Sequence, residues 1–356
     1  MNIFATYNVN GGRQPELDWA RGLAVFFMVC IHVAEEMTGI PPGVAAYIIN
    51  FTGGALAAPV FMFLLGAGLV YSKDKSPGRL ARRGCLLFAL HYGLNLAAFG
   101  IPVLIRDAGA WDGVTVTDFW NYVLEVDILA FAGLVFLLFA LKEKLGLGTS
   151  HLILFTLLMS CLNFLLIYPI DDVWLAAVAG LFVHVGEYSF FPFCVWIAYP
   201  VMGYIFGGFL IRCRDKGHFY RYLFIVAALV VAAMTLASRH YGFSLWKEYF
   251  VATSDFYFRD FLQDIMAGGI ICAWISMLYA VSRLPLPAVL TRPVFRLSRN
   301  ITVIYCCQWL IIGWLTFLTP FSPPPVAYVI FGLGILITAL SDVAALLYKK
   351  YSVKRT

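Results

Sequence analysis

Residues 16–37, ELDWARGLAVFFMVCIHVAEEM, have the pattern of a hydrophobic helix with an arginine near one end and a histidine near the other. Arg21 and His32 are eleven positions apart, which corresponds to about 16 Å along a helix axis. Eleven residues make almost three whole turns, so both side chains leave the helix by nearly the same face. About 20 apolar residues cross a bilayer. We therefore expect a spanning helix with a cation at one interface and an imidazole near the other.

The composition of the whole chain agrees with a membrane protein. Of its 356 residues, 62% are hydrophobic and only 13% are charged, and the mean hydropathy is +0.83. This apolar content exceeds what a soluble domain of this length needs, so we predict an all-α, polytopic integral membrane protein. The first apolar stretch is followed by no small-residue cleavage pattern, which favours a retained spanning helix over a signal peptide. The eight cysteines form no CxxC pair, so we expect reduced thiols and no metal site.

Hydropathy predicts one membrane domain, residues 1–356, with about ten transmembrane helices. The expected spans are residues 17–37, 53–72, 84–105, 121–141, 151–170, 190–211, 220–238, 262–281, 300–319 and 325–348. All but four of the 25 lysines and arginines fall in the loops and ends on one side; the exceptions are Arg106, Arg239, Lys247 and Arg259. The positive-inside rule therefore places both termini in the cytoplasm. Residues 171–189 are apolar but short, and we expect a half-helix at the outer interface.

His32 is the first candidate for chemistry. An ionisable group inside a membrane helix is a functional candidate by default, although a histidine can also simply bond a neighbouring helix. Near neutral pH an imidazole can take a proton from a hydroxyl or an amine, or can itself accept an acyl group. Its alignment with Arg21 on one helix favours the functional interpretation.

The arginines near the predicted cytoplasmic face are candidates for an anion site. Arg21 lies there, and two basic segments add to it: RLARRG, with Arg82 and Arg83, and LSRN, with Arg299 and Asn300. Guanidinium groups match phosphate oxygens bidentately, so several of them converging would suit a phosphorylated ligand. For each arginine alone, a solvated basic loop or an interfacial anchor is the alternative, and Asp18 could be only an ion-pair partner of Arg21.

Carboxylates stand at the outer end of the fourth predicted span. Asp127, in LEVDILAF, is the candidate to orient His32 and to stabilise its protonated form, and Glu125 is its neighbour. Both could instead be carboxylates favoured by the helix dipole at a helix start. His91 and Asn95 are interpreted as an interhelical hydrogen-bonding patch. His184 and Glu187, in the outer half-helix, could bind a polar acceptor or face water. Gln263 and Asp264 lie at the outer start of the eighth predicted span, where solvent is near, and Gln308 and Asp342 are isolated polar groups with no assignable role.

These motifs together resemble a known family. The segment ELDWARGLAVFFMVCIH resembles the first helix of the membrane acyltransferase superfamily, with its Arg-x10-His signature. That superfamily includes the acyltransferase 3-like surface-glycan O-acyltransferases of bacteria and the relatives of heparan-α-glucosaminide N-acetyltransferase. The segments APVFMFLLGAGLVYS, DILAFAGL and LSRNITVIY are similar to later helices of the second branch, in the right order. Gln308 stands where many relatives have a histidine, and residues 35–50 hold no counterpart of that branch's outer-loop histidine.

The resemblance implies ten helices around a central pore and acyl transfer, with acetyl-CoA as the expected donor from the cytoplasmic side. It implies His32 and Asp127 as catalytic residues, and Arg21, Arg82, Arg83, Arg299 and Asn300 as residues that bind the acyl-CoA. The acceptor would be a hydroxyl or an amine at the outer face, on a glycan, and the location the bacterial inner membrane. The alternative class is a multi-span transporter or exporter of a polar solute, which would also bury polar groups; a non-enzymatic scaffold is the third.

Overall fold

The computed structural model describes residues 3–109, 116–162, 170, 172–183, 189–250 and 260–352. Within these ranges the chain is helical, and its only β-pairing consists of two isolated bridges. The helices are α1 (Pro15–Val33), η1 (Ala34–Thr38), α2 (Val44–Leu56), α3 (Ala58–Tyr71), α4 (Pro77–Asn95), η2 (Leu96–Gly100), α5 (Ile101–Gly109), α6 (Val116–Leu124), α7 (Ile128–Leu145), α8 (Thr149–Leu162), α9 (Val173–Gly180), α10 (Phe193–Trp196), α11 (Ala198–Leu210), α12 (Lys216–Tyr241), α13 (Lys247–Phe250), α14 (Phe261–Ser282), α15 (Ala288–Arg299), α16 (Ile301–Leu318) and α17 (Ala327–Ser352). The prediction of an all-α fold is confirmed.

Eight helical segments of the described residues are long and apolar enough to cross a membrane. They are Pro15–Thr38, Val44–Tyr71, Pro77–Arg106, Phe193–Leu210, Lys216–Tyr241, Phe261–Ser282, Ile301–Leu318 and Ala327–Tyr351. The two other spans expected from hydropathy correspond to α7 and α8, which are helical but fall outside this set. The chain is therefore a multi-pass membrane protein, and the count of ten spans stays a prediction.

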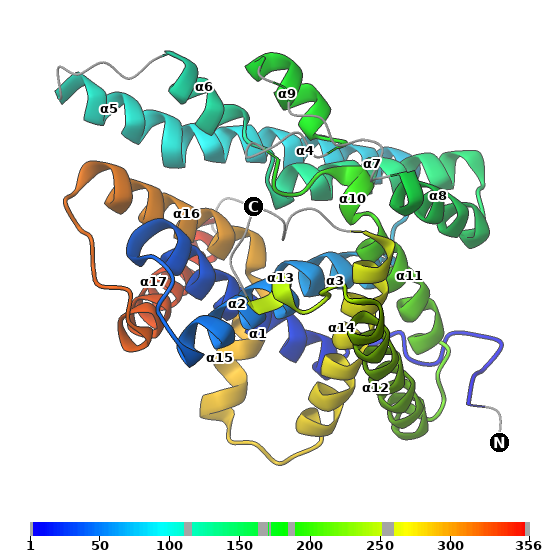
Figure 1. Ribbon diagram of the computed structural model, residues 1–356. Coiled ribbons are helices and arrows are strands. Elements are labelled where there is room, and N and C mark those ends of the chain that lie inside the picture. The colour runs from blue at the N-terminus through cyan, green and yellow to red at the C-terminus, as the bar shows by residue number, and fades with distance from the viewer. Residues whose placement is uncertain are drawn as a thin grey trace.

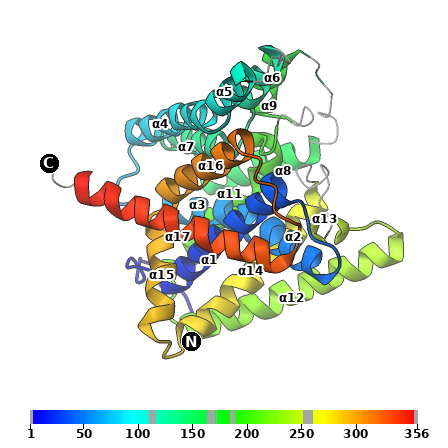
Figure 2. The same ribbon diagram turned by 90° about the vertical axis from the view of Figure 1, so that its left-hand side faces the viewer.

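Helix α1 lies in the middle of the molecule. It contacts α2, α3, α14, α15, α16 and α17, and it lies between the layer formed by α4, α5, α6, α7 and α9 and the pair α12 and α14 (Figures 1 and 2). Pro15 in its first turn needs no backbone N–H partner, and the acids Glu16 and Asp18 favour the positive end of the helix dipole. The segment that decides the fold in the sequence is therefore also central in space.

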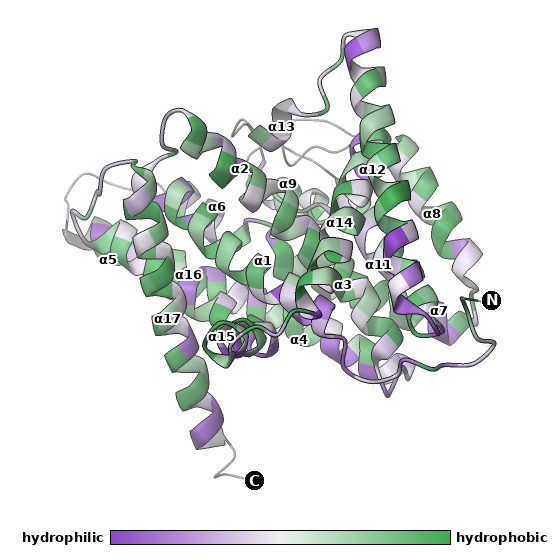
Figure 3. Cartoon of the chain, turned by 90° about the horizontal axis from the view of Figure 1, so that it is seen from below, coloured by the Kyte–Doolittle hydropathy of each residue, from purple (hydrophilic) through white to green (hydrophobic). Residues whose placement is uncertain are grey.

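The helices end at two opposite edges of the molecule. In Figure 3, α15 and the C-terminal end of α17 lie toward the lower edge, whereas α2 and α13 lie toward the upper edge. The arginines of α15 and Lys349 and Lys350 of α17 thus gather at one edge, as the lysine and arginine bias predicts. Which compartment this edge faces stays a prediction.

The fourth predicted span, residues 121–141, is not one continuous helix. The backbone is helical to Leu124, not helical from Glu125 to Asp127, where Asp127 is extended, and helical again from Ile128. The side-chain amide of Asn95 on α4 donates to the carbonyl oxygens of Val123 (3.3 Å) and Glu125 (2.9 Å). An irregular backbone at membrane depth needs such internal partners, so Asn95 stabilises the break.

Two shorter elements complete the comparison with the sequence. Helix α15 was not expected, because its arginines lower its hydropathy below that of a span; it packs on α1, where Val294 lies against Gly22. Helix α9 lies within the segment expected to hold a half-helix. His184 and Glu187 lie outside the described residues.

The contact between α3 and α11 depends on glycine, which gives a prediction for stability. A Cβ atom at Gly203 would overlap the carbonyl oxygen of Phe63, whereas a Cβ at Gly208 on the same helix would meet no atom within 4 Å. We expect Gly203→Ala to lower the free energy of unfolding by about 1–3 kcal/mol, because the two backbones must separate. Gly208→Ala is the matched control and should leave the thermal midpoint in detergent unchanged or slightly higher. Equal midpoints for both variants would contradict this account.

Candidate active site

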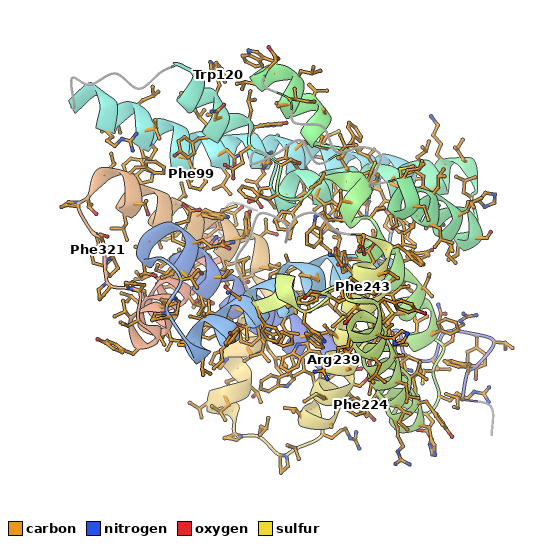
Figure 4. The ribbon with its side chains drawn as sticks, viewed as in Figure 1. Phe99, Trp120, Phe224, Arg239, Phe243 and Phe321 are labelled. Atoms are coloured by element: carbon orange, nitrogen blue, oxygen red, sulfur yellow. The ribbon has the colours of Figure 1, made fainter. Side chains whose placement is uncertain are left out.

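His32 lies in the last turn of α1, directly before the π-helical turn η1, and its ring is held by α16. Its Nδ1 atom is 3.1 Å from Oε1 of Gln308. Its imidazole stacks on the indole of Trp309, with ring centroids 4.1 Å apart and an interplanar angle of 24°. Phe99 packs edge-on against the same indole at 5.3 Å and lies between η2 and α16 (Figure 4). Turns of π-helix are frequent at functional sites, and here the turn follows the candidate base.

Asp127 binds α16 one turn away from this contact. Its Oδ1 accepts a hydrogen bond from the backbone N–H of Ile128 (2.6 Å), which caps α7, and its Oδ2 accepts one from the hydroxyl of Tyr305. We expected Asp127 itself at Nδ1 of His32, but Gln308 holds that position. Asp127 therefore fixes the helix that carries the histidine's partners. Whether it also has a catalytic role stays a prediction.

Further carboxylates lie near Asp127. Glu35 and Glu36 follow His32 in η1, and both are exposed. Each interacts electrostatically with Asp127, and so does Glu125. Four carboxyl groups, those of Glu35, Glu36, Glu125 and Asp127, thus lie at one end of the site. The exposed pair, Glu35 and Glu36, follows His32 closely in the sequence.

A pocket of about 340 Å³ is lined in part by Tyr305, the residue that binds Asp127. Its wall is formed by α1, α3, α4, α7 and the junction of α15 and α16, and most of the lining side chains are apolar. The polar side chains that line it are those of Arg21, Ser72, Arg83, Ser298, Thr302 and Tyr305. The pocket is thus an apolar chamber that meets guanidinium groups and also the tyrosine that binds Asp127.

Arg21 is held at the pocket by a small polar network. Its Nη1 atom donates to Oγ of Ser298 (3.3 Å) and lies 3.5 Å from Oδ1 of Asp18. Ser298 in turn donates to Asp18 at 2.7 Å, and Arg13 forms a second ion pair with the same carboxylate. The ion pair of Arg21 with Asp18, named above as an alternative role for Asp18, is present. Because one carboxylate serves two arginines, the network keeps a net positive charge.

The five predicted acyl-CoA-binding residues do not all converge on the pocket. Arg83 lines it and lies over the ring of Phe136, 4.5 Å from the centroid, whereas its neighbour Arg82 lies outside the lining, although both residues are exposed. Arg299 is exposed and donates to a carbonyl of its own helix. Asn300 is buried at the junction of α15 and α16, and its Oδ1 has no hydrogen-bond partner among the described residues. The structure therefore brings together Arg21 and Arg83.

Other polar groups in apolar helices bind neighbouring helices. Ser160 of α8 donates to Asp264 of α14 at 3.1 Å, and Arg296 of α15 pairs with Asp342 of α17 at 2.5 Å. Both contacts join neighbouring helices. Neither was expected: Asp264 was expected near solvent and is buried, and Asp342 had no assigned role.

Sequence reasoning missed the side chains of α16 that hold His32. Tyr305, Gln308 and Trp309 are spaced i, i+3 and i+4, so they share one helix face, and this spacing is visible in the segment YCCQW. The spacing predicts a shared face, but it does not indicate that this face contacts α1.

Fold and site together define a class: a multi-pass membrane protein whose central helix carries a half-buried histidine and an arginine that lines an apolar pocket. The chain belongs to the acyltransferase 3 family of membrane proteins, because the family's model, described as an acyltransferase domain, matches residues 14–343. The match begins just before α1 and ends within α17, so it includes the pocket and His32. No curated protein matches the chain. The family defines the protein as a membrane acyltransferase, as the first-helix motif implied.

Proposed function

We propose that the protein transfers an acetyl group from cytoplasmic acetyl-CoA to a hydroxyl or an amine of a glycan at the outer face of the bacterial inner membrane. One observation carries this proposal. The apolar pocket has Arg21 and Arg83 in its wall together with Tyr305, which lies on the α16 face that holds His32. A ligand with phosphates at one end and a reactive acyl group at the other matches this sequence of groups.

The donor fits the pocket by charge and by size. The phosphates of CoA would bind the guanidinium groups of Arg21 and Arg83, which offer paired N–H donors for phosphate oxygens. The pantetheine arm would lie in the apolar chamber. At about 340 Å³ the chamber is at the lower end of the range of about 300–1,000 Å³ for small-molecule sites, which favours acetyl over a long acyl chain.

The chemistry would take place at His32. Because Gln308 holds Nδ1, the Nε2 atom is the one that can accept a proton from the acceptor's O–H or N–H group. The acceptor oxygen or nitrogen then bonds to the thioester carbonyl carbon, the carbon–sulfur bond breaks, and the CoA thiolate takes the proton from His32. In a second version Nε2 itself receives the acyl group and passes it to the acceptor. Asp127 would hold α16 through Tyr305 in either version.

The acceptor would approach from the end where Glu35 and Glu36 are exposed. Carboxylates can accept hydrogen bonds from sugar hydroxyls, so this end can hold a polar acceptor while the pocket holds the donor. The two substrates would meet from opposite ends of the central helix.

The test is binding and slow hydrolysis of acetyl-CoA by the purified protein in detergent. We expect saturable binding and release of free CoA thiol at a rate above that of protein-free detergent. A protein that neither binds acetyl-CoA nor releases thiol would contradict the proposal and favour the transporter.

A further inference from the structure

We infer that Gln308 is a positioning residue that fixes the tautomer and the orientation of His32. This inference rests on the proposed function, since it assigns the group that prepares the base of that reaction. Within the described residues it is the contact between α1 and α16 that defines which ring nitrogen of His32 stays free.

The burial and the bonding of Gln308 argue for this role. Its side chain is 0% exposed, and its one assigned hydrogen bond among the described residues joins Oε1 to His32. Its Nε2 amide group is buried without a partner there. Buried amides that serve helix packing are usually satisfied at both ends, and an unsatisfied donor destabilises the fold. The buried amide group of Gln308 therefore lowers the stability of the fold, and the hydrogen bond to His32 offsets this destabilisation.

The direction of the hydrogen bond selects the tautomer. The Oε1 atom of an amide can only accept, so Nδ1 of His32 must carry the hydrogen. A neutral imidazole with hydrogen on Nδ1 has its lone pair on Nε2. That lone pair is what a general base needs.

The orientation of the ring is fixed by two adjacent residues. Gln308 binds an edge of the imidazole and Trp309 stacks on its face at 4.1 Å. Asp127 binds Tyr305 one turn earlier on the same helix. The contacts limit both rotation and tilt of the ring, so Nε2 keeps one direction.

The kinetic test compares Gln308→Met, Gln308→Glu and Ile304→Met. Gln308→Met keeps the length of the side chain but removes the acceptor; Gln308→Glu keeps an acceptor oxygen; Ile304 is equally buried on α16 and serves as the packing control. We expect Gln308→Met to lower kcat about 10- to 100-fold, the range for losing an orienting partner, with the KM for acetyl-CoA unchanged. Gln308→Glu should recover most of kcat at alkaline pH, where pairing with a carboxylate no longer keeps the imidazole protonated. Ile304→Met should keep wild-type kcat.

Two kinetic outcomes would overturn the inference. One is a Gln308→Met protein with wild-type kcat. The other is an equal loss in all three variants, which would show that any change in this buried face lowers activity through packing alone.

A spectroscopic readout tests the tautomer without any activity. In protein labelled with ¹⁵N-histidine, the signals of His32 are assigned by their absence in His32→Ala. We expect the Nδ1–H tautomer in the wild type and a mixture of tautomers in Gln308→Met. A wild-type Nε2–H tautomer would reverse the direction of the bond and overturn the inference. If the wild-type protein transfers no acetyl group, the proposed function fails, whereas the tautomer measurement still decides the contact itself.

Discussion

His32→Ala is expected to abolish acetyl transfer while leaving acetyl-CoA binding within about twofold of the wild type. A positioned general base contributes about 100- to 10,000-fold to a rate, so its loss should bring turnover close to background. Binding should persist because the pocket is lined by other residues and His32 does not belong to its wall. The measurement is release of CoA thiol, with calorimetric titration of acetyl-CoA for the same preparation.

His240→Ala is the matched control for this variant. His240 is exposed in the last turn of α12, far along the chain from the pocket-lining helices, and its loss should change neither rate nor binding. An active His32→Ala protein would contradict the assignment of the base. Acid quenching of the wild type with labelled acetyl-CoA also separates the two mechanisms, because only the version with an acyl-histidine leaves label on the protein.

Arg83→Ala is expected to weaken acetyl-CoA binding about 10- to 100-fold, because a hydrogen bond to a charged group contributes about 1.5–3 kcal/mol and each 1.4 kcal/mol is about tenfold in Kd. The neighbouring residue supplies the control. Arg82 carries the same charge in the same loop-proximal turn and is exposed like Arg83, but it does not line the pocket. Arg82→Ala should therefore change Kd less than about threefold, through the general field alone.

Arg21→Ala should weaken acetyl-CoA binding about as much as Arg83→Ala does, with one difference. Its removal frees Asp18 from one of its two arginines, so the carboxylate adds some repulsion toward phosphate. Equal losses in Arg82→Ala and Arg83→Ala would contradict the pocket assignment and leave only a diffuse basic surface. If neither variant loses affinity for acetyl-CoA, the proposed phosphate site is ruled out.

The expectations that came true depend on local patterns. Hydropathy predicts that residues 17–37 form a spanning helix, and their spacing predicts that Arg21 and His32 both lie on it, because these properties belong to one segment. The pairing of Arg21 with Asp18 is equally local, since residues three apart are neighbours on a helix. The family follows from the same first-helix motif together with the order of the later ones.

The expectations that changed depend on neighbours far away in the chain. The break at residues 125–127 requires Asn95 of α4 to bind the freed carbonyl groups, and no property of residues 121–141 alone reveals that partner. Likewise, the periodicity of α16 shows that Tyr305 and Gln308 share a face but not that the face meets α1.

The sequence alone thus determined the class of the protein, its central helix and its candidate base, because hydrophobic length and residue spacing follow from the covalent chain. Only the tertiary structure decided that Gln308 rather than Asp127 binds His32, and that Arg83 rather than Arg82 reaches the pocket. Successive residues of a helix point about 100° apart, so two adjacent arginines have the same charge but different neighbours. Which of them meets the pocket depends on how α4 packs against α7, and packing is a property of the whole fold.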